Sequence, residues 1–227
     1  MSLNLFTRYG LSGGAPIAPS GEPEVSASVT GGTGIVTSLD VGIPAGSGGL
    51  LLIVLRLTRG SGSAGVNTPS GWTKATDGGT FIGELAALWR IADGTEGSTV
   101  TVTLDNAAFT AWVAYRISGA ASIGTPVEGL VTAYNVHTPP ELTPSWGSAS
   151  VLWIAVQSTR RGTNEYTSAP ANYEGLLTGW SGGTGSNDAL VATAHRVLTA
   201  VSEIPGAFGF TGTASGAYSA TLAVRAA

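Results

Sequence analysis

Residues 98–104 read STVTVTL, and in this stretch threonine alternates with Val100, Val102 and Leu104. A period of two is typical of a half-buried β-strand, with the apolar side chains facing inward and the threonines outward. Residues 50–58, LLLIVLRLT, are apolar at successive positions, as in a strand that is covered on both faces. The two stretches together predict a β-protein in which at least one strand lies between two layers.

The rest of the chain continues this pattern, because short runs rich in Val, Ile, Leu, Thr and aromatic residues are separated by Gly, Ser, Pro, Asn and Asp. Residues 83–94, GELAALWRIADG, are also compatible with a helix, but Trp89 and Ile91 alternate with Arg90 and favour a strand. We expect an all-β fold, an antiparallel, jelly-roll-like β-sandwich of about ten strands. The predicted strands span residues 25–29, 35–43, 50–58, 81–92, 98–104, 110–118, 127–136, 150–158, 189–198, 206–211 and 218–225.

The two halves of the chain resemble each other at a spacing of about 100 residues, which predicts pseudo-repeats over residues 35–118 and 137–227. They could form two small tandem sandwiches or one sandwich with two related halves. We favour one sandwich, because five strands alone would leave exposed edges and a thin core. The matched pairs are Leu51 with Val151, Trp72 with Tyr173, Arg90 with Arg196, and Arg116 with Arg225.

Residues 1–24 are expected to form an extended N-terminal arm, and residues 25–227 the sandwich domain. Residues 10–23, GLSGGAPIAPSGEP, have no apolar periodicity and cannot build a core. The segment before them is unusually apolar for a tail. Two interpretations stay open: the arm docks on a neighbouring subunit, or it forms a first strand or a cover on its own sandwich. The apolar residues of the arm are Leu3, Leu5, Phe6 and Tyr9.

The composition excludes several classes of function. Charged residues make up only 11% of the chain, the net charge is −4, and no basic stripe is present that could neutralise nucleic-acid phosphates. Cysteine is absent and there are two histidines, so we expect no disulfide, no thiolate nucleophile, no metal centre and no cofactor. The longest apolar run, residues 50–55, is too short to cross a bilayer, and no secretory signal is expected.

Sequence motifs for catalysis are weak. Residues 179–183, GWSGG, fit G-x-S-x-G, and Asp188 and His195 follow Ser181, but the flanks predict loop and strand where a nucleophile elbow needs a helix. Residues 60–65, GSGSAG, fit G-x-G-x-x-G without the following helix that would bind a pyrophosphate. We therefore expect no enzyme activity. Paired carboxylates could serve a glycosidase, but the candidates are expected in solvated turns; they are Asp93, Glu96, Asp105, Glu165 and Glu174.

Aromatic residues in loops or at strand ends are the remaining candidates for binding. Aromatic rings stack on the apolar faces of sugars, so Trp180, Trp146 and Tyr173 are candidate glycan contacts. Trp180 in GWSGGTGSND is the best of the three. Trp72 and Tyr173 occupy matching positions in the two halves, which favours plugs at the ends of the sandwich instead.

The duplicated strands, the PSGW turn at residues 69–72, the LWRIADGTE turn and the closing AYRISG strand resemble accessory virion proteins of tailed bacteriophages and gene transfer agents. The resemblance covers residues 50–227. It implies a β-sandwich head spike, decoration, fibre or baseplate protein, assembled as a homo-oligomer with other capsid or tail proteins in the bacterial host cytoplasm and touching host surface polysaccharide. The alternative is a carbohydrate-binding module or lectin.

Overall fold

The computed structural model describes residues 21–60, 62, 64–80, 82–132, 134–160, 164–183, 185–212 and 215–227. Within these ranges every regular element is a β-strand, so the predicted all-β fold is confirmed. Residues 83–91 form a strand and not the alternative helix. The four apolar residues of the predicted arm, Leu3, Leu5, Phe6 and Tyr9, lie outside the described residues.

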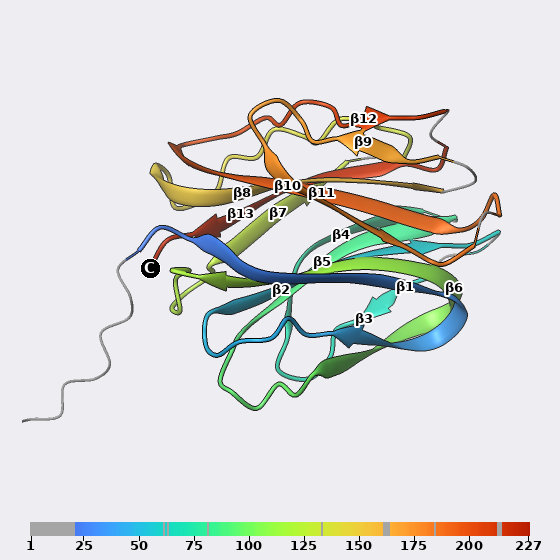
Figure 1. Cartoon of the computed structure of the whole chain (residues 1–227), viewed down its shortest axis with the longest axis horizontal. Helices are drawn as coiled ribbons and strands as arrows, with labels where there is room; N and C mark the ends of the chain where they lie inside the picture. Colours follow the sequence, from blue (N-terminus) through green and yellow to red (C-terminus); the bar gives the residue numbers. More distant parts are fainter. Residues whose placement is uncertain are drawn as a thin grey trace, which may run out of the picture.

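Most strands belong to two antiparallel sheets that lie one above the other (Figure 1). The first sheet has the order β1 (Glu24–Gly42), β6 (Thr99–Ser118), β2 (Leu50–Thr58), β5 (Gly83–Ile91) and β4 (Thr73–Thr80), and β3 (Val66–Asn67) also pairs with β6. The second sheet has the order β7 (Val127–Val131), β13 (Tyr218–Arg225), β8 (Ala149–Arg160), β11 (Ala189–Ala200) and β10 (Glu174–Trp180). A separate pair joins β9 (Tyr166–Ser168) to β12 (Gly209–Phe210).

The main hydrophobic core lies between the sheets. Leu52 and Val54 of β2 pack in one buried cluster with Leu152 and Ile154 of β8. The intervening side chains of β2, such as Ile53, belong to a second buried cluster on the outer face of the first sheet. The prediction that residues 50–58 form a strand covered on both faces is therefore confirmed.

Each sheet also carries a cover on its outer face. The paired strands β1 and β6 shift register between Thr33 and Ser38, and beyond this point Leu39 and Val102 pack over the outer side chains of β2. On the second sheet, Trp153 of β8 lies in one buried cluster with Tyr166 of β9 and with the loop residues Tyr173 and Phe208. These covers explain why both faces of the central strands are apolar.

The two sheets follow the same order when their strands are counted along the chain. Leu51 pairs with Arg116 in the first sheet, and Val151 pairs with Arg225 in the second, so these predicted matches occupy equivalent places. The match of Arg90 with Arg196 is displaced by two residues. Arg90 pairs with Leu51, whereas Arg196 pairs with Trp153.

Strand boundaries differ from the prediction where glycine and threonine dominate. Residues 25–29 and 35–43 form one long β1, and residues 98–104 and 110–118 form one β6. β4 and β10 were not predicted, and β7 and β12 are shorter than expected. The described residues thus contain thirteen strands where about ten were expected.

One charged side chain lies inside the sandwich. The Arg56 guanidinium on β2 is fully buried, donates from Nη2 to the carbonyl of Gly216 at 2.5 Å, and lies 4.8 Å from the ring centroid of Tyr218. Burial removes the solvation of the cation and lowers its pKa to about 10. Arg56 thus joins the first sheet to the last strand of the second.

Candidate functional site

The G-x-S-x-G match spans the end of β10, Gly179 and Trp180, and the start of the turn toward β11. The Ser181 hydroxyl accepts a hydrogen bond from the backbone N–H of Ala189 at 3.0 Å, and Asp188 accepts one from Gly185 at 2.5 Å. His195 lies six residues farther along the extended strand β11, about 20 Å from Ala189 at 3.3 Å per residue. The serine and the histidine are therefore not brought together.

The glycine-rich stretch 60–65 and the carboxylate Asp93 also have structural roles. The described part of the glycine-rich stretch 60–65 leads into strand β3 and not into a helix. Asp93 accepts hydrogen bonds from the backbone and hydroxyl of Thr95, at 2.9 and 2.6 Å, which hold the pKa of this exposed carboxyl below its ordinary value. These contacts shape a turn.

His195 is half-buried beneath Tyr115, with ring centroids 6.3 Å apart. Burial lowers the pKa of the imidazole, and the nearby Glu174 carboxylate partly opposes this shift. Its Nδ1 has no hydrogen-bond partner. The ring therefore packs as a neutral side chain at neutral pH.

The three predicted glycan contacts differ in exposure. Tyr173 is 8% exposed, donates its hydroxyl to Glu203 at 3.1 Å, and lies under the Arg196 guanidinium. Trp146 is half-buried with the Arg225 guanidinium 5.7 Å from its ring centroid. Trp180 is 47% exposed at the end of β10. Of these three rings, that of Trp180 is the most accessible to a ligand.

A small hollow lies beside Trp180, on the outer face of the second sheet. We call it the aromatic hollow; its volume is about 260 Å³. Tyr166 comes from β9, more than ten residues before Trp180 in the chain, and was not predicted as a site residue. The hollow is lined by Glu165, Tyr166, Thr178, Trp180 and Leu190.

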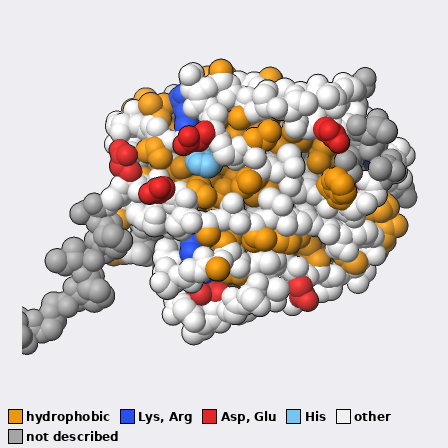
Figure 2. Space-filling model, viewed as in Figure 1, with side chains coloured by type: hydrophobic (Ala, Val, Ile, Leu, Met, Phe, Trp, Pro, Cys, Tyr) orange, Lys and Arg blue, Asp and Glu red, His pale blue; other side chains and the backbone are white. Residues whose placement is uncertain are grey.

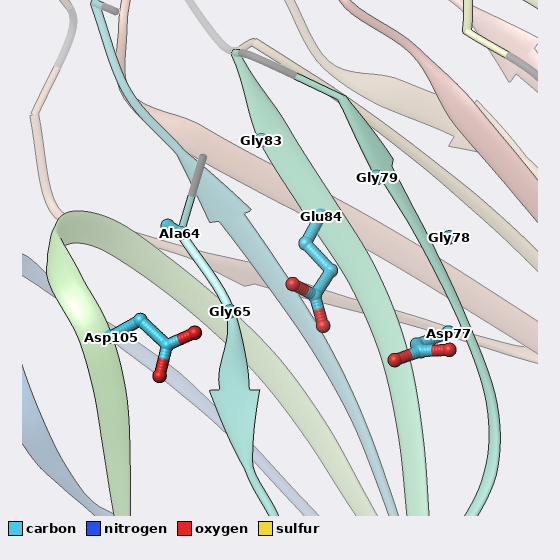
Figure 3. A pocket seen from close by; sticks show the side chains of 8 residues that line it. All are labelled: Ala64, Gly65, Asp77, Gly78, Gly79, Gly83, Glu84 and Asp105. Atoms are coloured by element: carbon cyan, nitrogen blue, oxygen red, sulfur yellow. The ribbon is translucent and has the colours of Figure 1, made fainter. Parts of the chain in front are cut away.

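A second hollow, of about 460 Å³, lies on the outer face of the first sheet (Figure 3). We call it the acidic hollow, because the carboxylates of Asp77, Glu84 and Asp105 point into it. Gly65 borders it, and a Cβ there would overlap the Asp105 carboxylate. The carboxyl of Asp105 was predicted in a solvated turn, but the residue belongs to β6.

The electrostatics of the acidic hollow centre on Glu84. Partial burial raises the pKa of its carboxyl, and Lys74 partly offsets this shift. Lys74 itself pairs with Asp77 at 2.7 Å. In the described ranges no group of three or more His, Asp or Glu side chains is placed to hold a metal ion.

One end of the sandwich is apolar and hollowed. We call it the arm-side end, because residues 21–24 enter β1 there beside Ser118 and Gly119 (Figure 1). Three adjoining hollows, of about 520, 310 and 260 Å³, meet around these two residues and residues 120–123. Val197 is 39% exposed and Ile123 is 81% exposed at this end.

The surface as a whole carries few charges. Figure 2 shows a face on which hydrophobic side chains form patches between scattered acidic groups. None of the described residues forms a helix that could cross a membrane. Comparisons of the chain with protein-family models, with curated proteins and with solved structures found no match.

Proposed function

We propose that this protein is a structural accessory component of a phage or phage-like particle, such as a head or tail decoration, spike or fibre. In this role it docks on neighbouring virion subunits, works as a homo-oligomer, and meets polysaccharide on the host surface. The observation that carries the proposal is the apolar arm-side end.

The arm-side end has the character of an interaction surface. Ile123 and Val197 leave apolar area in water, and the adjoining hollows offer shallow depressions that a partner chain could fill. Contiguous exposed apolar patches are rare on soluble monomers, and where they occur they often mark a protein–protein contact. The low charge of the chain supports the same role, since permanent interfaces are depleted of charged residues at their centres.

The arm itself supports docking. Residues 21–24 enter β1 at the arm-side end, and in the sequence a Gly- and Pro-rich segment separates the apolar residues Leu3, Leu5, Phe6 and Tyr9 from the sandwich. We infer that these residues anchor the protein on a neighbouring subunit.

The two halves support a rigid structural role. We infer that residues 35–118 and 137–227 are duplicated units, because both sheets share one strand order and one register at Leu51 and Val151. A jelly-roll-like sandwich built in this way has two rigid sheets around one shared core, which suits a component that bears load in a particle.

The test compares two triple variants of the full chain in particles from the producing host. Leu3→Asp, Leu5→Asp and Phe6→Asp replace three of the four apolar arm residues, while Ser2→Asp, Asn4→Asp and Thr7→Asp add the same charges at interleaved polar positions. We expect the first variant to fall at least tenfold in copies per particle, measured by quantitative mass spectrometry, and the second to stay near the wild-type number.

Equal incorporation of both variants would contradict docking through the arm. A wild-type chain that is absent from purified particles would overturn the structural proposal and favour the alternative, a free carbohydrate-binding module or lectin.

A further inference from the structure

We infer that the aromatic hollow binds a single ring of a neutral saccharide, with Trp180 as the stacking platform. This inference rests on the proposed contact with host polysaccharide and assigns the site of that contact. It extends the sequence prediction, which already ranked Trp180 first of the three aromatic residues, by naming the walls of the site.

Trp180 is the platform because its ring is accessible while its backbone is fixed. The side chain is 47% exposed, whereas Trp72, Trp112 and Trp153 are buried. The carbonyl of Trp180 lies so close to β1 that a Cβ on Gly32 would overlap it. A ring on such a clamped backbone loses little conformational entropy when a ligand stacks on it.

The walls of the hollow match the two faces of a pyranose ring. Leu190 and the buried ring of Tyr166 give an apolar side, which suits the C–H face of a sugar. Thr178 and Glu165 are exposed and place a hydroxyl and a carboxylate at the rim, where sugar hydroxyls can donate and accept hydrogen bonds.

The size and charge of the hollow limit the class of ligand that it can bind. A volume of about 260 Å³ is below the roughly 300–1,000 Å³ that is typical of sites for drug-sized molecules, so it suits one ring of a chain and not a whole oligosaccharide. None of the described lining residues is cationic, and the chain has a net charge of −4. Among these described residues an acidic polysaccharide would meet the Glu165 carboxylate and no cation, so we assign a neutral saccharide.

The other two rings cannot take this role in the same way. Tyr173 is 8% exposed and Trp146 is half-buried, whereas Trp180 is 47% exposed. The acidic hollow of the first sheet has carboxylates in place of an aromatic ring. Among these described residues, we therefore assign the stacking platform to Trp180.

The experiment measures binding of the full chain to immobilised neutral gluco-, galacto- and manno-oligosaccharides, with polygalacturonate as the acidic probe. We expect binding to at least one neutral probe, at least tenfold weaker binding to polygalacturonate, and a loss of at least tenfold on Trp180→Ala, about 1.4 kcal/mol. Trp180→Phe keeps an aromatic face and should bind within about threefold of the wild type.

Ile204→Ala is the control, because it removes an exposed apolar side chain in the loop after β11, away from the hollow. Thermal melting of each variant verifies folding. Wild-type protein that binds none of the neutral probes, or Trp180→Ala protein that binds as the wild type does, would overturn the assignment.

The two proposals fail separately. Trp180→Ala protein should enter particles in normal copy number without binding saccharide, whereas the apolar arm variant should bind saccharide without entering particles. Loss of incorporation on Trp180→Ala would show that this residue is a docking contact, and the saccharide site would be rejected.

Discussion

The aromatic and acidic hollows occupy the same corner of two sheets that share one strand order. The acidic hollow lies between β3, β4 and β5 on the first sheet. The aromatic hollow lies between β9, β10 and β11 on the second. Glu84 lines the acidic hollow, and Trp180 lines the aromatic hollow. The comparison teaches that the backbone order fixes where a hollow forms, while a few side chains decide whether it attracts charge or an apolar face.

Elsewhere the two sheets agree closely. The turns before β4 and β10 each close with a backbone hydrogen bond, from Trp72 to Pro69 at 3.1 Å and from Tyr173 to Pro170 at 3.0 Å. Gly71 and Asn172 precede the aromatic residues with φ of 78° and 65°. Trp72 and Tyr173 are each 8% exposed, as expected for plugs that fix the turn against the outer face.

The largest effect that tests this agreement is loss of the two plugs. We expect Trp72→Ala and Tyr173→Ala each to lower the free energy of unfolding by about 3–5 kcal/mol, because each removes a buried aromatic ring and leaves a cavity. Urea denaturation followed by far-UV circular dichroism would measure both. The matched turns predict that the two losses differ by no more than about 1 kcal/mol.

Tyr173→Phe is the control for this pair, since it keeps the ring and removes only the hydroxyl bond to Glu203. It should cost about 1 kcal/mol. If one of the two alanine variants were as stable as the wild type, the plugs would not be equivalent and the agreement between the sheets would stop at strand order.

A smaller effect is expected where the two sheets meet at their edges. Gly32 of β1 lies against the carbonyl of Trp180, and Gly179 of β10 lies against that of Trp112. Gly32→Ala should cost about 1–3 kcal/mol, because the added methyl group forces the edge of the second sheet away from β1. Thermal unfolding would measure the change.

Gly34→Ala is the matched control on the same strand. A Cβ at Gly34 has no heavy atom within 4 Å, so this variant should unfold within about 0.5 kcal/mol of the wild type. Equal stability of the two variants would show that the sheets are not held together at this edge.

The sequence predicted the parts of the fold that are buried. β2 and β13 have the predicted boundaries, because their apolar runs are bounded by polar turns. β4 and β10 escaped prediction since they are edge strands that pair on one side only, and TKATDGGT has no apolar period. The sequence predicted long strands such as β6 as two shorter strands, because a short polar stretch interrupts the apolar pattern. In the structure the backbone hydrogen bonds continue through that stretch.

The site was predictable only in part. Trp180 stands in a segment rich in Gly, Ser and Asn, which indicates exposure. Tyr166 and Glu165 reach the same hollow through β9, whose three residues carry no pattern of their own. The acidic hollow was missed because Glu84 stands in an apolar strand, and only the pairing of β5 with β2 and β4 reveals that its carboxyl is partly buried.

The smallest predicted effect concerns the Glu84 carboxyl, which distinguishes the acidic hollow from the aromatic hollow. Burial raises the pKa of the Glu84 carboxyl above its ordinary 4.5, so the folded state holds this proton more tightly than the unfolded state. The stabilisation is fully present below pH 4.5 and is lost as the pH rises through the raised pKa of the folded protein. Glu84→Gln removes the titrating group, and we expect this variant to be more stable than the wild type at pH 7 by about 1 kcal/mol or less.

Urea denaturation of both proteins between pH 4 and pH 8 would measure this difference. The advantage of Glu84→Gln should grow with pH above 4.5 and then level off once the wild-type carboxyl is ionised in both states. A constant difference across this range would mean that the Glu84 carboxylate is fully solvated, and the contrast between the two corners would then be one of shape and not of charge.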